Sequence, residues 1–183
     1  MIQLVQSLST AERVLAAGFA ASAALIIGAH GFERIGGYVP CVLCLDQREA
    51  HWAALGVTSA GLIAARMFKS RLGAAAALGT TALVYAVSAG LAFFHTGVEF
   101  GYWPGPAQCS AAAAVDIGAI GSALGQKATA PSCDSVQWSF LGVSMAGYNL
   151  LASAGLFAMT LITAITETHK AKAQRLSKAE PIS

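Results

Sequence analysis

Long apolar stretches alternate with polar segments along this chain. The apolar stretches cover approximately residues 14–32, 45–66, 72–94 and 141–165. Crossing the hydrocarbon core of a bilayer takes about 20 helical residues, a length that the third and fourth stretches reach at once. The pattern therefore predicts an all-α membrane protein, a four-transmembrane-helix bundle in which residues 1–183 form a single domain.

The second stretch carries the most information about where a helix begins. Its uninterrupted apolar run extends only from Trp52 to Ala65, which is too short to span a bilayer. The helix must therefore begin several residues earlier, near Cys44 or Leu45. This start places Arg48 in the first turns of the helix, at the outer edge of the membrane.

Small residues recur at every fourth position in two stretches. They are Ala16, Ala20, Ala24 and Gly28 in the first, and Ala82, Ala86 and Gly90 in the third. Such a stripe lets membrane helices approach closely. An Ala-rich sequence also produces this spacing by chance, so both explanations stay open.

The polar segment from about residue 95 to 140 contains an Ala-rich run, Ala111 to Leu124, interrupted by Asp116. This run is too short to cross a bilayer, and we predict a short helix that lies at the membrane interface. A fifth span is the alternative, and it would put Cys133 on the opposite side of the membrane from Cys109.

The composition supports a membrane protein, with 56% hydrophobic and 11% charged residues. Soluble domains carry about 25% charged residues, so a water-soluble core is a poor explanation. The net charge of +2 is too small and too scattered to indicate a nucleic-acid partner. A signal peptide explains the first stretch poorly, because the charged front is weak.

Basic residues give the orientation of the predicted spans. With both termini in the cytoplasm, the inside would hold Arg13, Arg66, Lys69, Arg71, Lys170, Lys172, Arg175 and Lys178, and the outside Arg34, Arg48 and Lys127. Basic residues prefer cytoplasmic loops, so we expect this orientation. It puts all four cysteines in two outer loops, approximately residues 33–44 and 95–140, where disulfides persist.

Cys41 and Cys44 form a Cys-x-x-Cys motif at the start of the predicted second helix. The free N–H groups and dipole of a helix N-terminus stabilise negative charge, so a cysteine there can become a reactive thiolate. Cys44 is the candidate thiolate. Arg48, four residues later on the same face, could hold this thiolate or polarise a carbonyl oxygen of an electron acceptor. A charge in the headgroup layer is the other interpretation of Arg48.

Three other roles fit the motif less well. A zinc site lacks a second Cys-x-x-Cys or His pair, so no metal site is expected, and c-type haem attachment needs a His where this chain has Leu45. A purely structural disulfide that closes so short a loop would add little stability, because it restricts the unfolded chain only slightly. Cys109 and Cys133 alone would fit a structural disulfide, but two pairs on one side of the membrane can exchange electrons. In a bilayer, a dissolved quinone is the natural final acceptor.

Histidines lie near the ends of the apolar stretches. His95 ends the third stretch on the same side as the Cys-x-x-Cys motif, where it is either a polar cap at the interface or a hydrogen-bond donor to a quinone oxygen. His30, His51 and His169 are interpreted as interface residues.

These residues resemble the disulfide bond formation protein B (DsbB) family over nearly the whole chain. The matching pieces are Pro40-Cys41-Val42-Leu43-Cys44 with Gln47-Arg48, Phe94-His95, Gly105-Pro106 ahead of Cys109, Pro131-Ser132-Cys133-Asp134, and Trp138 to Asn149. Members of this family are quinone reductases of the bacterial inner membrane that reoxidise DsbA, a periplasmic thioredoxin-fold dithiol oxidase. Gln47 stands where some relatives carry an acid.

The resemblance implies a role for each cysteine. Cys109 would form a mixed disulfide with a DsbA-like oxidase, and Cys133 would pass electrons to Cys41. Cys44 would engage ubiquinone or menaquinone, with Arg48 and His95 beside the quinone ring. Two alternatives remain: a non-catalytic membrane protein braced by two disulfides, and a DsbB-like relative with one dedicated partner.

Overall fold

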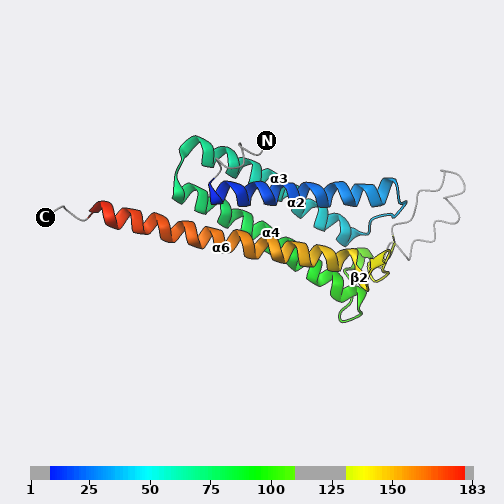
Figure 1. Ribbon diagram of the computed structural model, residues 1–183. Coiled ribbons are helices and arrows are strands. Elements are labelled where there is room, and N and C mark those ends of the chain that lie inside the picture. The colour runs from blue at the N-terminus through cyan, green and yellow to red at the C-terminus, as the bar shows by residue number, and fades with distance from the viewer. Residues whose placement is uncertain (1–8, 110–130, 180–183) are drawn as a thin grey trace, which may run out of the picture.

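The computed structural model describes residues 9–109 and 131–179, and its four long helices run side by side in one bundle (Figure 1). They are α2 (Thr10–Arg34), α3 (Val42–Phe68), α4 (Arg71–Glu99) and α6 (Met145–Ala179). A hairpin of β1 (Ser139–Phe140) and β2 (Val143–Ser144) precedes α6. Each helix packs on the next in this order, and α6 closes the ring on α2. The predicted all-α bundle is confirmed.

The outer surface of the bundle is that of a membrane protein. The helices α2, α4 and α6 are long and apolar enough to cross a membrane, and α3 is a fourth helix of 27 residues. Ile27, Leu83, Leu151 and Ile162 point outward and are 64% to 71% exposed. So much open apolar surface is rare on a soluble protein but suits contact with lipid.

The start of α3 differs from the prediction. The helix begins at Val42, two residues before Cys44, and Cys41 is its N-cap, with the Cys41 side chain accepting a hydrogen bond from the Cys44 main-chain N–H at 3.3 Å. An N-cap is a single side chain that accepts a hydrogen bond from a main-chain N–H of the first turn. The length of an apolar run therefore does not reveal where the helix begins. Cys41 therefore precedes the helix, and Cys44 lies in its first turn.

The start of α6 also differs from the prediction. Residues 141–144 belong to the hairpin, because Leu141 and Gly142 turn the chain with φ values of 49° and 77°. At its other end α6 continues to Ala179, past the predicted membrane span, which ends at about residue 165. The Ala-rich run from Ala111 to Leu124 lies outside the described residues, so its interfacial helix stays a prediction.

The helix contacts do not follow the predicted small-residue stripe of α2. Gly28 of that stripe is exposed, with no atom within 4 Å of the place of a Cβ. The buried face of α2 instead carries Leu15, Gly18 and Ser22. A Cβ on Gly18 would lie 3.0 Å from the Tyr85 hydroxyl oxygen, so the missing side chain leaves room for that ring. The regular spacing in α2 is thus a consequence of its Ala-rich composition.

Candidate active site

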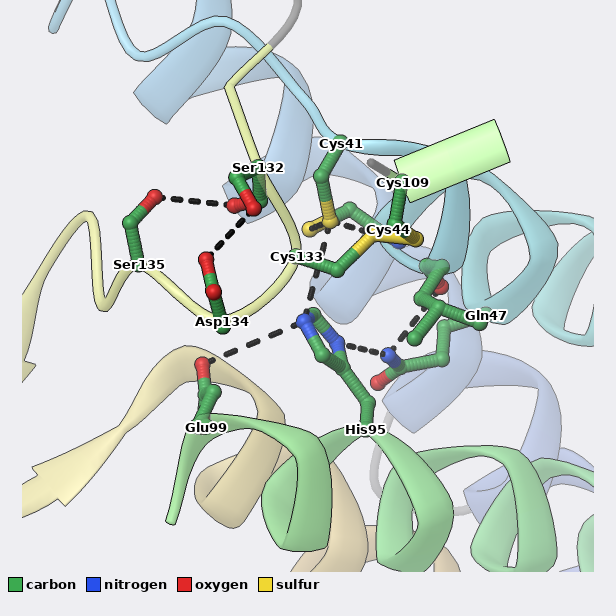
Figure 2. Close-up of a disulfide and its surroundings, with 11 residues drawn as sticks. Cys41, Cys44, Gln47, His95, Glu99, Cys109, Ser132, Cys133, Asp134 and Ser135 are labelled. Atoms are coloured by element: carbon green, nitrogen blue, oxygen red, sulfur yellow. Dashed lines mark hydrogen bonds and ion pairs between the residues drawn. A yellow bond between two sulfur atoms is a disulfide. The ribbon is translucent and has the colours of Figure 1, made fainter. Parts of the chain in front are cut away.

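The four cysteines lie close together, where α3 begins (Figure 2). Cys109 and Cys133 form a disulfide, and they share one buried cluster with Cys41, on which Cys44 packs. The Sγ atoms of Cys41 and Cys44 lie 2.6 Å apart. The two pairs that the sequence predicts on one side of the membrane are therefore packed together, with Cys41, Cys109 and Cys133 at most 3% exposed.

The chain between α4 and Cys109 is held against the end of α4 by Trp103. The Trp103 indole N–H donates to the carbonyl oxygen of Phe94 at 2.8 Å. The ring lies on Gly97, where a Cβ would come within 1.9 Å of its Cζ2 atom. Only a glycine leaves space for this approach. The contact fixes the path of the segment that brings Cys109 to the other three cysteines.

The start of α3 gives the cysteines of its motif different properties. Contact with the Cys44 sulfur and burial hold the pKa of Cys41 well above its usual range. Cys44 lies in the first turn, where helix N–H groups stabilise an anion. A reduced pair therefore keeps its proton on Cys41 and places the negative charge on Cys44. Cys44 is also the reactive cysteine that the sequence predicts, although the predicted helix begins later.

His95 of α4 reaches the motif on the Cys41 side. Its Nε2 atom lies 3.7 Å from the Cys41 Sγ and 4.0 Å from a carboxylate oxygen of Glu99. Its Nδ1 atom lies 2.8 Å from the Gln47 amide nitrogen. His95 is 3% exposed. Figure 2 shows the ring between the two cysteine pairs and α4.

Arg48 is anchored on α2. Its guanidinium forms an ion pair with the Glu33 carboxylate and donates to the carbonyl oxygen of Ala29 at 3.3 Å. The Arg48 side chain is 14% exposed and that of Glu33 is 35% exposed. Glu33 is a site residue that sequence reasoning missed. The only signal in the sequence is an acidic residue at the end of the first apolar stretch.

An apolar cavity of about 530 Å³ opens beside these groups, between α2, α3 and the beginning of α6. Its wall is mainly apolar, with Leu25, Ala29 and Phe32 from α2 among the lining residues. The polar lining residues include Cys44, Gln47, Arg48, His51, His95, Glu99 and Asn149. A mainly apolar pocket with a few convergent polar groups is typical of a site for a small organic molecule.

Beneath the motif, polar side chains connect the helices. His51 is 3% exposed, so its predicted place at the membrane interface is wrong. Its Nε2 atom lies 2.8 Å from the Asn149 Oδ1 atom, and its Nδ1 atom lies 3.3 Å from the Ser22 hydroxyl oxygen. The Asn149 amide nitrogen donates to Gln47 Oε1 at 2.7 Å. Nothing in the sequence indicated that these side chains contact one another.

A family model described as Disulfide bond formation protein DsbB matches residues 11–163, which include every cysteine of the chain. The chain belongs to the DsbB family. No curated protein and no solved structure matches it. Membership in the DsbB family implies a role as a disulfide-forming oxidoreductase in a multi-pass membrane protein, and the family consists of thiol:quinone oxidoreductases.

The DsbB-family site also contains a group of possible metal ligands. Ligand atoms of Cys41, Cys44 and His95 lie within 4.8 Å of one another. Two thiolates on one zinc ion are separated by about 3.7 Å, given Zn–S bonds of about 2.3 Å and tetrahedral geometry. The 2.6 Å separation of the Cys41 and Cys44 sulfurs fits exchange between cysteines better than ligation.

Proposed function

We propose that this DsbB-family chain reoxidises a periplasmic DsbA-like dithiol oxidase and passes the electrons to ubiquinone or menaquinone. The observation that carries the proposal is the packing of both cysteine pairs in one cluster beside an apolar cavity. Cys44 lines that cavity together with Arg48 and His95. A protein braced by disulfides needs neither the cavity nor the contact between the pairs.

The proposed route uses thiol–disulfide exchange from a state in which both pairs are oxidised. A thiolate of the partner attacks Cys109 and releases Cys133 as a thiolate. Cys133 attacks Cys41, and Cys44 leaves as a thiolate. The second thiolate of the partner then releases Cys109, which attacks Cys133 to re-form that disulfide and to release Cys41.

The reduced Cys41–Cys44 pair then gives its two electrons to the quinone and becomes a disulfide again. In sum, one dithiol and one quinone become one disulfide and one quinol, and the two thiol protons end on the quinol oxygens. Arg48 stabilises the charge that develops on a quinone oxygen as electrons arrive. The apolar wall of the cavity accommodates the ring and the start of its tail.

The proposed location is the bacterial inner membrane, with both termini in the cytoplasm and the cysteines in the periplasm. The support is the excess of basic residues on the cytoplasmic side. A reporter enzyme that is active only in the cytoplasm should give a signal when fused after Lys69 and none when fused after Gln126. The reverse pattern would place every cysteine in a reducing compartment and contradict the proposed function.

The partner step is tested by trapping its intermediate. In Cys133→Ser, the free Cys109 thiolate attacks the disulfide of an oxidised thioredoxin-fold oxidase, and Cys133 is absent to resolve the product. A covalent complex should appear on a non-reducing gel and disappear with reductant. The control is the double variant with Cys109→Ser added, which should give no complex. If Cys133→Ser formed no such complex, the proposed route would be contradicted. A non-catalytic protein braced by two disulfides, or a relative with one dedicated partner, would then be favoured.

A further inference from the structure

A chain of buried hydrogen bonds runs from the interior of the bundle to the cysteine motif. It passes from His51 on α3 to Asn149 on α6, back to Gln47 on α3, and on to His95 on α4. Each of these three contacts is 2.7–2.8 Å long. The chain ends at the Cys41 sulfur, 3.7 Å from His95 Nε2.

The donor and the acceptor of each hydrogen bond in this series follow from a group that can only accept a hydrogen bond. The Leu43 carbonyl lies 3.1 Å from the side-chain nitrogen of Gln47, and a carbonyl oxygen can only accept a hydrogen bond. This contact sets the orientation of the Gln47 amide, with its nitrogen toward His95 and its oxygen toward Asn149. The Asn149 amide must then present its nitrogen to Gln47 and its oxygen to His51.

The same rule determines which ring nitrogen of His95 carries the proton. Gln47 presents an N–H donor to the His95 Nδ1 atom, which must therefore be the unprotonated nitrogen of a neutral ring. The proton lies on Nε2, the atom that faces the Cys41 sulfur. Every hydrogen bond from His51 onward thus donates toward Cys41, and hydrogen bonds aligned in this way strengthen one another.

We infer that Asn149 and Gln47 are positioning residues that hold the neutral His95 ring with its Nε2–H directed at the Cys41 sulfur. The part of this inference that concerns turnover rests on the proposed function. In that route Cys41 leaves as a thiolate when Cys109 attacks Cys133, and the Nε2–H is the donor placed to stabilise this thiolate. The ring lies 3.7 Å from the sulfur that Cys133 attacks in that route, so it lies where the exchange takes place.

The test reverses the donor pattern with changes of nearly constant shape. In Asn149→Asp, position 149 offers only oxygens, and a hydrogen bond from the Gln47 nitrogen to a carboxylate is stronger than its bond to the Leu43 carbonyl. The Gln47 amide therefore turns its nitrogen to Asp and its oxygen to His95. In Gln47→Glu, a carboxyl oxygen faces His95 directly. Both variants should move the His95 proton from Nε2 to Nδ1. NMR of the ring nitrogens of the purified full-length protein reports this change, and the His95 signals are identified by their loss in His95→Gln.

Turnover provides the second readout. The kcat for quinone reduction should fall about 10-fold in both variants, the worth of one hydrogen bond to a charged sulfur, while the KM for quinone changes less than about twofold. The control is Thr160→Val on α6, which removes a buried hydroxyl that bonds only within its own helix, to the Leu156 and Phe157 carbonyls. It should keep the wild-type kcat and the wild-type His95 signals.

The outcomes separate this inference from the proposed function. If His95 Nδ1 stays unprotonated in both variants, or if the proton moves and kcat stays at the level of Thr160→Val, the positioning role is wrong. If the wild type reduces no quinone, the proposed function is wrong. In that case the NMR signals alone still support or contradict the arrangement of Asn149, Gln47 and His95.

Discussion

Cys44→Ser is expected to reduce the rate of quinone reduction by at least about 1,000-fold, the scale on which removal of a nucleophile acts. Cys44 is the cysteine in the first turn of α3 and lines the apolar cavity. A serine hydroxyl stays protonated there and can neither form the disulfide with Cys41 nor deliver electrons. The measurement is the absorbance of a soluble quinone in the presence of purified protein and a reduced thioredoxin-fold dithiol.

The matched control for this variant is Ser59→Ala on the same helix. The Ser59 hydroxyl bonds to the Leu55 carbonyl within α3, far from the motif in sequence, so its loss should leave the rate unchanged. Cys44→Ser should still fold, because the hydrogen bond at the helix start runs from the Cys44 main-chain N–H to Cys41. Retention of quinone reduction by Cys44→Ser would contradict the role of Cys44.

Arg48→Met is expected to lower kcat/KM for quinone by about 10- to 100-fold, because a hydrogen bond to a charged group contributes about 1.5–3 kcal/mol. Methionine keeps much of the side-chain length but has no donor for a quinone oxygen. The variant also breaks the ion pair with Glu33. The Glu33 carboxylate is partly exposed, so water can solvate it and the fold should tolerate the change.

Glu33→Gln separates the proposed hydrogen bond of Arg48 to quinone from its ion pair with Glu33. This variant removes the ion pair but keeps the guanidinium at the cavity. Its kcat/KM should stay within about threefold of the wild type, because the pair is partly open to solvent and such pairs contribute little. If Glu33→Gln lost as much activity as Arg48→Met, the ion pair itself would be the important contact. A direct role of Arg48 toward quinone would then be wrong.

The helices α2, α4 and α6 could be predicted from the length of their apolar stretches, and α3 from a shorter apolar run that had to be extended. The ends of the helices could not be predicted in this way. The motif helix begins at Val42 because the Cys41 sulfur caps it, a contact between single atoms that hydropathy does not register. The hairpin before α6 contains Phe140, Leu141 and Val143. These residues are as apolar as those of a membrane helix, so the predicted span extended into the hairpin.

Some features of the site could likewise be predicted from the sequence, and others could not. The Cys-x-x-Cys motif, Arg48 and His95 could be singled out because their chemistry is recognisable from residue type and local spacing. The partners of Gln47 could not, because they lie 48 and 102 residues away in the sequence, at His95 and Asn149. His51 was misplaced because it lies just before the uninterrupted apolar run, whereas in the structure it lies on the buried face of α3, with Gln47 and Ala54.

The central claim is that electrons pass from a protein dithiol through both cysteine pairs to a quinone, and one measurement tests it most directly. Purified protein is given a reduced thioredoxin-fold dithiol and a quinone, and the quinol formed is compared with the dithiol consumed. The account predicts one quinol for each dithiol oxidised in the wild type, and no quinol above background in Cys41→Ser, Cys44→Ser, Cys109→Ser or Cys133→Ser. Dithiol oxidation without quinol formation, or equal turnover in a variant that lacks one of these cysteines, would contradict it.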